Sequence, residues 1–169
     1  MKKILVVTDL QTDFVDGALG TSEAQAIIPT VCEKIKNFDG EVVFTMDTHT
    51  SQYPETQEGK KLPVPHCIRG TDGWQLDSRV QPLSEGCRII EKPAFGSVEL
   101  AKYVADGSFE EIEVIGLCTD ICVISNAMLL KAFLPEVPIT VDSACCAGVT
   151  PESHQKALDV MRSCQITIV

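Results

Sequence analysis

The stretch that decides the fold begins at residue 112 and reads Ile112-Glu113-Val114-Ile115-Gly116-Leu117-Cys118-Thr119-Asp120-Ile121-Cys122-Val123. The apolar run 112–117 predicts a buried strand. Residues 125–132 (SNAMLLKA) predict a helix, for which Thr119 or Asp120 is a suitable N-cap. The chain therefore passes from a strand directly into a helix at this point.

The same alternation of strands and helices extends along the rest of the chain. Further strands are predicted at 4–7, 41–46, 87–90, 137–141 and 165–169. One helix ends near Lys36, a second covers 98–104 between Ser97 and Gly107, and a third opens at Thr150 with a proline at its first position. This order predicts an α/β fold with a six-stranded, mainly parallel sheet between two helical layers. The length of 169 residues fits a single domain over 1–169.

Composition excludes several classes of protein. The net charge of −10 argues against binding of nucleic acid or an anionic membrane surface. No apolar stretch approaches the roughly 20 residues of a membrane span. The apolar run after Lys3 ends too early, at Asp9, for a signal peptide, so we expect a cytoplasmic protein. In that compartment the eight cysteines are expected to be reduced thiols.

Residues 47–75 interrupt the periodic pattern. This segment is rich in proline and glycine and contains two of the three histidines and the only tryptophan. Loops of this length inside compact domains are usually functional or disordered. We therefore predict a functional metal-binding or lid loop.

Chemically useful side chains follow the predicted strands. Ligands of open parallel sheets bind beyond the carboxyl ends of the strands, so residues just past those ends should gather at one edge. In strand order these residues are Asp9, then Asp47 with His49, then Lys92, Cys122 and Asp142.

Cys122 is the candidate nucleophile at this edge. Its predicted place in the first turn of a helix offers free backbone N–H groups and the positive end of the helix dipole, which favour a thiolate and a developing oxyanion. No histidine lies near a strand end outside the 47–66 segment, so Asp9 is the better candidate for the base. Lys92 then supplies the cation. Each residue alone has an ordinary structural explanation, but the three together predict a catalytic site.

A second group of residues has the composition of a metal site. Asp47 and His49 are followed by His66, with Glu58 between them as a further candidate ligand. Imidazoles combined with a carboxylate suit Zn²⁺, Mn²⁺ or Fe²⁺. The alternative is two solvated loop histidines and an aspartate in a turn.

Other residues receive simpler interpretations. Asp120 is interpreted as a helix cap and Asp13 as a turn residue, and His154 is expected on the surface of a helix. Phe14 is either a core residue or a wall of the site. The pair Cys145-Cys146 is expected in a tightly packed loop near the edge of the sheet.

Five motifs resemble those of a known family. Residues 6–14 (VVTDLQTDF), 91–97 (EKPAFGS) and 116–123 (GLCTDICV) resemble the aspartate, lysine and nucleophile motifs of isochorismatase-like cysteine hydrolases. Residues 45–49 (TMDTH) and 65–71 (PHCIRGT) are similar to the metal segment of the nicotinamidase (pyrazinamidase) branch. The match covers essentially the whole chain in order. It implies an isochorismatase-like α/β/α sandwich with Rossmann-like topology.

The resemblance also implies an activity. Enzymes of this branch hydrolyse nicotinamide to nicotinate and ammonia without a nucleotide cofactor, through an acyl-thioester intermediate. By this analogy Asp9 takes the proton of the Cys122 thiol, and Lys92 stabilises the charged pair. The backbone N–H groups of Cys118 and Cys122 would form the oxyanion hole, with a cis peptide bond before Cys118.

The resemblance further assigns the substrate pocket and the metal. A divalent ion, Zn²⁺ first with Mn²⁺ or Fe²⁺ as alternatives, would be held by Asp47, His49 and His66, with Glu58 as an additional candidate, and would bind the ring nitrogen. Phe14 would pack on the ring. Many nicotinamidases carry a tryptophan three residues before the second metal histidine, where this chain has Pro63.

Other functions remain open from the sequence. Another small amide or a ureide is an alternative substrate on the same scaffold. In a third reading, a metal at the histidine cluster generates the nucleophile and Cys122 is inert. A fourth reading is a binding protein without catalysis. The expected partner is a small-molecule amide, with neither nucleic acid nor membrane, and a homo-oligomer is open.

Overall fold

The sheet has six strands, all parallel, in the order β3-β2-β1-β4-β5-β6. The computed structural model describes the complete chain, residues 1–169. The strands are β1 (Lys3–Thr8), β2 (Glu41–Asp47), β3 (Arg88–Lys92), β4 (Glu111–Leu117), β5 (Ile139–Ala147) and β6 (Thr167–Ile168). This arrangement confirms the predicted α/β class and the parallel sheet.

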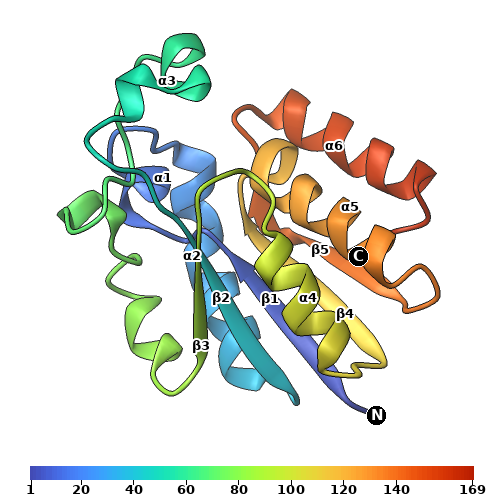
Figure 1. The fold of residues 1–169 in the computed structure, drawn as a ribbon. Coiled ribbons are helices and arrows are strands. Elements are labelled where there is room, and N and C mark those ends of the chain that lie inside the picture. Colours follow the sequence, from blue (N-terminus) through green and yellow to red (C-terminus); the bar gives the residue numbers. More distant parts are fainter.

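Helices cover both faces of the sheet (Figure 1). They are α1 (Thr12–Val15), α2 (Ser22–Asn37), α3 (Gln57–Lys61), α4 (Val98–Asp106), α5 (Ile124–Phe133) and α6 (Pro151–Ser163). Side chains alternate across a strand, so Ile4 and Val6 join the core under α4, α5 and α6, while Leu5 and Val7 join the core under α1 and α2. The result is the predicted three-layer sandwich.

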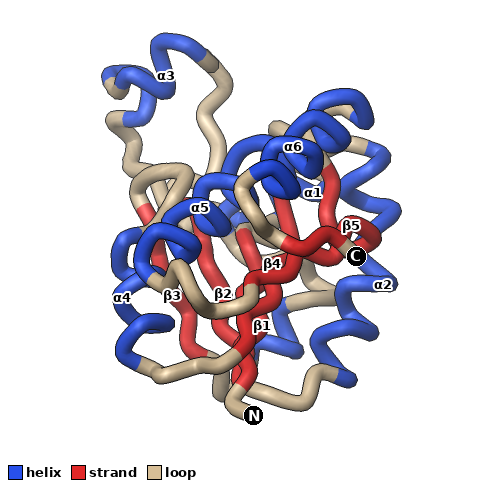
Figure 2. The backbone as a smooth tube through the Cα atoms, turned by 90° about the vertical axis from the view of Figure 1, so that its right-hand side faces the viewer, coloured by secondary structure: helices blue, strands red, loops and turns tan.

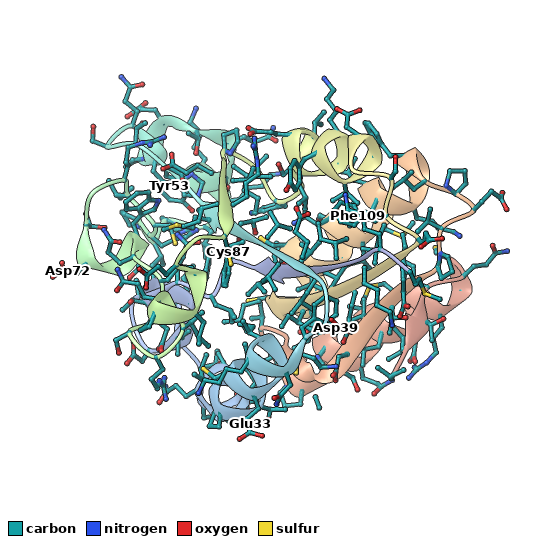
Figure 3. The ribbon with its side chains drawn as sticks, turned by 90° about the horizontal axis from the view of Figure 1, so that it is seen from below. Glu33, Asp39, Tyr53, Asp72, Cys87 and Phe109 are labelled. Atoms are coloured by element: carbon teal, nitrogen blue, oxygen red, sulfur yellow. The ribbon has the colours of Figure 1, made fainter.

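Figure 3 shows the molecule from the amino ends of the strands. Phe109 is buried in the core on the α4–α5 side, whereas Glu33 projects from the outer face of α2. None of the helices is both long and apolar enough to cross a membrane.

Helix starts follow the predicted capping chemistry in two cases. Ser97 accepts a hydrogen bond from the backbone N–H of Leu100 at the start of α4. Thr150 forms a capping box with Ser153 at the start of α6, where Pro151 takes the first position. These contacts satisfy N–H groups that a helix start leaves without partners.

The fifth strand differs from its prediction. Val114 of β4 pairs with Val141, but Gly116 pairs with Cys146, so β5 contains a bulge between its two paired parts. The predicted place of Asp142 at the catalytic edge is therefore wrong. Its carboxylate lies in the bulge and forms an ion pair with Lys34 of α2 at 2.8 Å. Cys145 and Cys146 are buried within this strand and not in a loop.

The segment 47–75 is more ordered than a loop. It contains two short 3₁₀ helices, Tyr53–Glu55 and Asp72–Trp74, with α3 between them. In both backbone views α3 projects beyond the carboxyl ends of the strands (Figures 1 and 2). The segment therefore lies over the edge where sheets of this type bind ligands.

Candidate active site

Three side chains at or just beyond the ends of separate strands meet at the carboxyl edge of the sheet. Asp9 follows β1, Lys92 ends β3, and Cys122 lies in a π-helical turn after β4, residues Thr119–Val123, called here the π-turn. The Lys92 Nζ lies 2.6 Å from Asp9 Oδ2 and 3.4 Å from the Cys122 Sγ. All three residues are buried. The structure thus brings together the acid, cation and thiol singled out in the sequence.

Burial controls the protonation of this group. It raises the pKa of the Asp9 carboxyl, an effect that the Lys92 ammonium opposes. Burial also raises the pKa of the Cys122 thiol well above its usual range, and the Asp9 charge adds to this rise. The prediction that the helix start lowers the thiol pKa is therefore wrong for the free site. Burial therefore favours the neutral form of the Cys122 thiol, which lies beside the ion pair of Asp9 and Lys92.

The backbone holds Asp9 in a special conformation. Its φ of +46° lies in the left-handed region, which aspartate tolerates better than most residues. The Thr45 hydroxyl donates a hydrogen bond to Asp9 Oδ1 at 2.6 Å, and the Asp9 N–H donates to the Thr45 carbonyl oxygen at 3.2 Å. Strained backbone of this kind concentrates at functional sites, where the surrounding structure enforces it.

The π-turn begins differently from the prediction. Cys118 occupies the N-cap position without a side-chain cap, so neither Thr119 nor Asp120 caps the helix. The Asp120 Oδ1 instead accepts a hydrogen bond from the N–H of Val149 at 3.1 Å. The peptide bond before Cys118 is cis, as the resemblance implies.

His154 lies on a helix as predicted, but it is less exposed than the surface residue expected from the sequence. It is half-buried, and its Nδ1 lies 2.7 Å from the hydroxyl oxygen of Thr119, a fully buried residue of the π-turn. A histidine near the start of α6 therefore contacts the turn that carries Cys122.

Two buried side-chain amides that the sequence did not single out support the backbone of the site. The Gln11 side chain bonds to both the N–H and the carbonyl of Asp47, at 2.7 and 2.8 Å. The Asn126 amide donates to the Cys122 carbonyl at 2.9 Å and accepts from the Ser97 N–H at 2.8 Å. A signal for Asn126 was available, because a polar residue on the inner side of an apolar helix needs buried partners.

A second cluster lies beside the first. Asp47, His49, Glu58 and His66 each offer one ligand atom, and these four atoms lie within 4.8 Å of one another. His49 Nε2 is 2.9 Å from Asp47 Oδ2, and His66 Nε2 is 3.5 Å from both Asp47 Oδ2 and Glu58 Oε1. Asp13 was interpreted as a turn residue. Its Oδ2 accepts a hydrogen bond from the N–H of Cys67 at 2.8 Å and so anchors the backbone next to His66.

The donor set fits a divalent metal. The Nδ1 of His66 lies 2.9 Å from the Val64 carbonyl oxygen, which can only accept, so Nδ1 carries the proton and Nε2 presents a lone pair. That lone pair faces two carboxylates, an arrangement that a cation between them would stabilise. Asp47 Oδ1 is buried and has no hydrogen-bond partner. Two imidazoles with two carboxylates suit Zn²⁺, Mn²⁺ or Fe²⁺.

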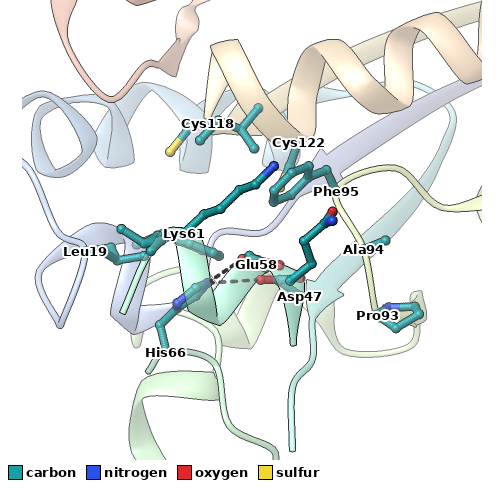
Figure 4. A pocket seen from close by; sticks show the side chains of 14 residues that line it. Leu19, Asp47, Glu58, Lys61, His66, Pro93, Ala94, Phe95, Cys118 and Cys122 are labelled. Carbon is teal, nitrogen blue, oxygen red and sulfur yellow. Dashed lines mark ion pairs between the residues drawn. The ribbon is translucent and has the colours of Figure 1, made fainter. Parts of the chain in front are cut away.

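A cavity of about 330 Å³ connects the two clusters (Figure 4). Cys122 and Cys118 lie on one wall, and Asp47, Glu58 and His66 lie on another. Phe14 also lines the cavity, and its ring packs on His66 with the centroids 5.4 Å apart. Other lining residues are Leu19, Gln57, Lys61, Leu62, Pro93, Ala94, Phe95 and Ile121. Pro63 is not among them, and the apolar residues that line the cavity include its neighbour Leu62 as well as Phe14 and Phe95.

Comparisons with known proteins agree with this architecture. The chain matches the isochorismatase domain over residues 3–169. An uncharacterized isochorismatase family protein of Bacillus subtilis is 33% identical over 177 residues, covering 94% of this chain and 93% of that protein.

Solved structures agree as well. The pyrazinamidase of Pyrococcus horikoshii in complex with zinc superimposes with a TM-score of 0.85 at 30% identity, covering 100% of this chain and 99% of the other. The N-carbamoylsarcosine amidase of Thermoplasma acidophilum gives a TM-score of 0.79 at 27% identity, over 99% and 95% of the two chains. The chain therefore belongs to the isochorismatase family, as a hydrolase of its amide-cleaving nicotinamidase branch.

Proposed function

We propose that this protein hydrolyses nicotinamide to nicotinate and ammonia. One observation carries the proposal: Cys122, which contacts the buried Asp9–Lys92 pair, lines the same cavity as Asp47, Glu58 and His66 of the metal cluster. In this proposal the Cys122 thiol attacks the amide carbon, and a metal held by the second set of side chains binds the far side of the ring. The similarity to a pyrazinamidase whose crystal structure contains zinc supports an amide-hydrolysing enzyme with a bound metal.

In the first step the Cys122 sulfur attacks the carboxamide carbon while Asp9 accepts the thiol proton. A sulfur–carbon bond forms, and the carbonyl electron pair moves to oxygen. The raised pKa of Asp9 makes this carboxylate a better proton acceptor than an exposed one. Lys92 remains protonated and offsets the charge of the pair. The backbone N–H groups of Cys118 and Cys122 are proposed to donate to the oxyanion.

In the second step the carbon–nitrogen bond breaks. The leaving nitrogen takes the proton from Asp9 and departs as ammonia, which leaves an acyl thioester on Cys122. Asp9 then removes a proton from water, whose oxygen attacks the thioester carbon. The sulfur–carbon bond breaks, the proton returns to the sulfur, and nicotinate leaves. Every proton transfer in this cycle uses the same carboxylate.

The segment 47–75 is proposed as both metal-binding segment and lid. A divalent metal, Zn²⁺ first with Mn²⁺ or Fe²⁺ as alternatives, would bind the ring nitrogen and fix the amide beside Cys122. Asp47, His49, Glu58 and His66 would hold it. Phe14 is positioned to pack on the ring, because its side chain lines the cavity next to His66. This chemistry requires no nucleotide cofactor.

A second candidate substrate is a carbamoyl or ureido acid. Lys61 of α3 reaches across the cavity without an ion-pair partner (Figure 4). An unpaired ammonium group there would suit a substrate that carries a carboxylate as well as an amide. The similarity to an N-carbamoylsarcosine amidase points the same way.

Ammonia release from a small panel of amides separates these candidates, with bound metal assayed alongside. Nicotinamide and pyrazinamide are expected to be hydrolysed, and benzamide, which lacks the ring nitrogen, should be hydrolysed much more slowly. Release from N-carbamoylglycine but not from nicotinamide would overturn the proposal in favour of the second candidate. Equal rates for nicotinamide and benzamide would remove the proposed role of the metal.

A further inference from the structure

The contact between α6 and the π-turn links two segments that are far apart in the sequence. Thr119 is completely buried, and its hydroxyl oxygen lies 2.7 Å from His154 Nδ1. A second link runs from the Val149 N–H to Asp120 Oδ1 at 3.1 Å. A Cβ on Gly148 would lie only 2.7 Å from the backbone nitrogen of His154, so the start of α6 packs closely here.

The contact between Thr119 and His154 is a hydrogen bond in which the hydroxyl can donate to the ring nitrogen. Burial lowers the pKa of His154, and the Asp120 charge only partly opposes this, so the imidazole is neutral at pH 7. A neutral Nδ1 can accept the proton of the Thr119 hydroxyl. Because Thr119 is buried, loss of this acceptor would leave its hydroxyl without a partner, which is costly.

The bond is not needed to build α6. That helix has its own capping box at Thr150 and buries Ala157, Leu158 and Met161 against the core. The bond instead acts on the π-turn, which contains Cys122 and which Cys118 precedes as the N-cap. Thr119 lies between the two residues whose backbone N–H groups are proposed to bind the oxyanion.

We infer that His154 is a positioning residue, which holds the π-turn through Thr119 and thereby aims the backbone N–H groups of Cys118 and Cys122 at the reacting carbonyl oxygen. His154 does not line the cavity, so it acts without touching the substrate. The inference rests on the proposed function for its catalytic consequence, while the tether itself can be tested without substrate.

The test compares His154→Ala with His154→Asn, whose amide can place an acceptor near the position of Nδ1. Gln155→Ala is the matched control, because Gln155 is the next residue of α6 and bonds only to Asp159 on the exposed side. We expect kcat for nicotinamide to fall about 10- to 100-fold in His154→Ala, in line with misplaced catalytic groups. KM should change little, and His154→Asn should recover most of kcat. The unfolding temperature should fall by only a few degrees in His154→Ala, because the buried Thr119 hydroxyl loses its partner.

Two further measurements distinguish positioning of the backbone N–H groups from a general loss of structure around the site. Alkylation of Cys122 by iodoacetamide forms no oxyanion, so its rate should be the same in His154→Ala and the parent protein. The double variant Thr119→Val/His154→Ala should be no slower than the slower single variant, because both remove the same bond. Parallel losses of kcat and alkylation rate would overturn the inference, and so would additive effects of the two substitutions.

A substrate-free arm distinguishes failure of the inference from failure of the proposed function. Hydrogen exchange of the backbone amides in residues 118–123 is expected to accelerate in His154→Ala and not in Gln155→Ala. Unchanged exchange in His154→Ala overturns the tether whatever the substrate. If the parent protein releases no ammonia from nicotinamide, the proposed function fails, and faster exchange still supports the tether.

Discussion

At the scale of single residues, Lys92 connects the two halves of the site. Its Nζ lies 2.6 Å from Asp9 Oδ2, 3.4 Å from Cys122 Sγ and 3.6 Å from Asp47 Oδ1. Burial alone would lower the pKa of Lys92, but Asp9, Cys122 and Asp47 raise it above its ordinary value. Lys92 is therefore a permanent cation, which compensates two buried carboxylates.

Replacing this cation should cost stability as well as activity. Lys92→Met leaves Asp9 and Asp47 buried beside an apolar side chain, and removal of one partner from a buried ion pair typically costs about 3–5 kcal/mol. Urea unfolding of the metal-loaded protein measures the loss, with the exposed Lys102 of α4 changed to Met as the control. A loss below about 1 kcal/mol would mean that Asp9 is protonated in the folded protein, contrary to the proposed base.

Cys122→Ala tests which group is the nucleophile. Because this change removes only a buried sulfur, we expect a folded protein that keeps its metal and loses all measurable turnover. Cys164→Ala, at the end of α6, is the control and should remain fully active. Retained turnover in Cys122→Ala would favour the reading in which the metal cluster generates the nucleophile.

Thr45→Val tests Asp9 through its pKa. Asp9 must be ionised to accept a proton, so activity is lost as the pH falls through the pKa of Asp9. Burial raises that pKa, and the hydrogen bond from Thr45 lowers it. Removing the hydroxyl should therefore move the acidic limb of the kcat/KM profile to higher pH, with the plateau within a few-fold of the parent. A limb that stays in place or moves to lower pH would contradict the role of Asp9 as base.

At the scale of elements, the position of α3 decides whether Glu58 reaches the metal cluster. Gly59 packs directly against the backbone of Tyr53, and the Cβ of an alanine there would overlap the Tyr53 carbonyl oxygen. Tyr53 is itself fixed, because its hydroxyl donates to the Leu62 carbonyl at 2.8 Å. α3 therefore has little freedom to shift while it keeps Glu58 in place.

Gly59→Ala should displace α3 and withdraw Glu58 from the cluster. We expect metal affinity to fall about 10- to 100-fold, as for loss of a supporting group around a metal. Titration with Zn²⁺ in the presence of a competing chelator measures the change. Lys60→Ala, an exposed neighbour in the same helix, is the control and should bind metal normally. Unchanged affinity in Gly59→Ala would mean that Glu58 is not a ligand.

The elements also show what a sequence can and cannot predict. Hydrophobic runs and caps such as Ser97 and Thr150 predicted the strands and helices, because these signals are local. The convergence of Asp9, Lys92 and Cys122 followed from the rule that parallel strands share a carboxyl edge. The bulge that removes Asp142 from this edge depends on pairing between β4 and β5, which no local pattern encodes. The contact of His154 could not be predicted for the same reason, because its partner Thr119 lies 35 residues away in the sequence.

At the scale of the whole molecule, the metal cluster joins the lid segment to the sheet. Asp47 ends β2, whereas Glu58 and His66 come from the segment that projects above the strands. Without a cation, the Asp47 and Glu58 carboxylates face each other and burial raises the pKa of Glu58. Metal binding should therefore stabilise the whole fold, since an ion that binds only the folded state adds RT ln(1 + [L]/Kd) to its stability.

Removal of the metal by a chelator should lower the unfolding temperature of the protein. At a free metal concentration of 100 Kd the gain is about 2.7 kcal/mol, which corresponds to roughly 5–10 °C for a chain of this size. His66→Ala should abolish the difference between metal-loaded and chelated protein, because it removes a ligand. Glu55→Ala, an exposed acid of the same segment outside the cluster, should keep it. An equal stabilisation of His66→Ala and the parent by Zn²⁺ would show that the ion binds elsewhere, for example at cysteine thiols, and would remove the metal from the proposed site.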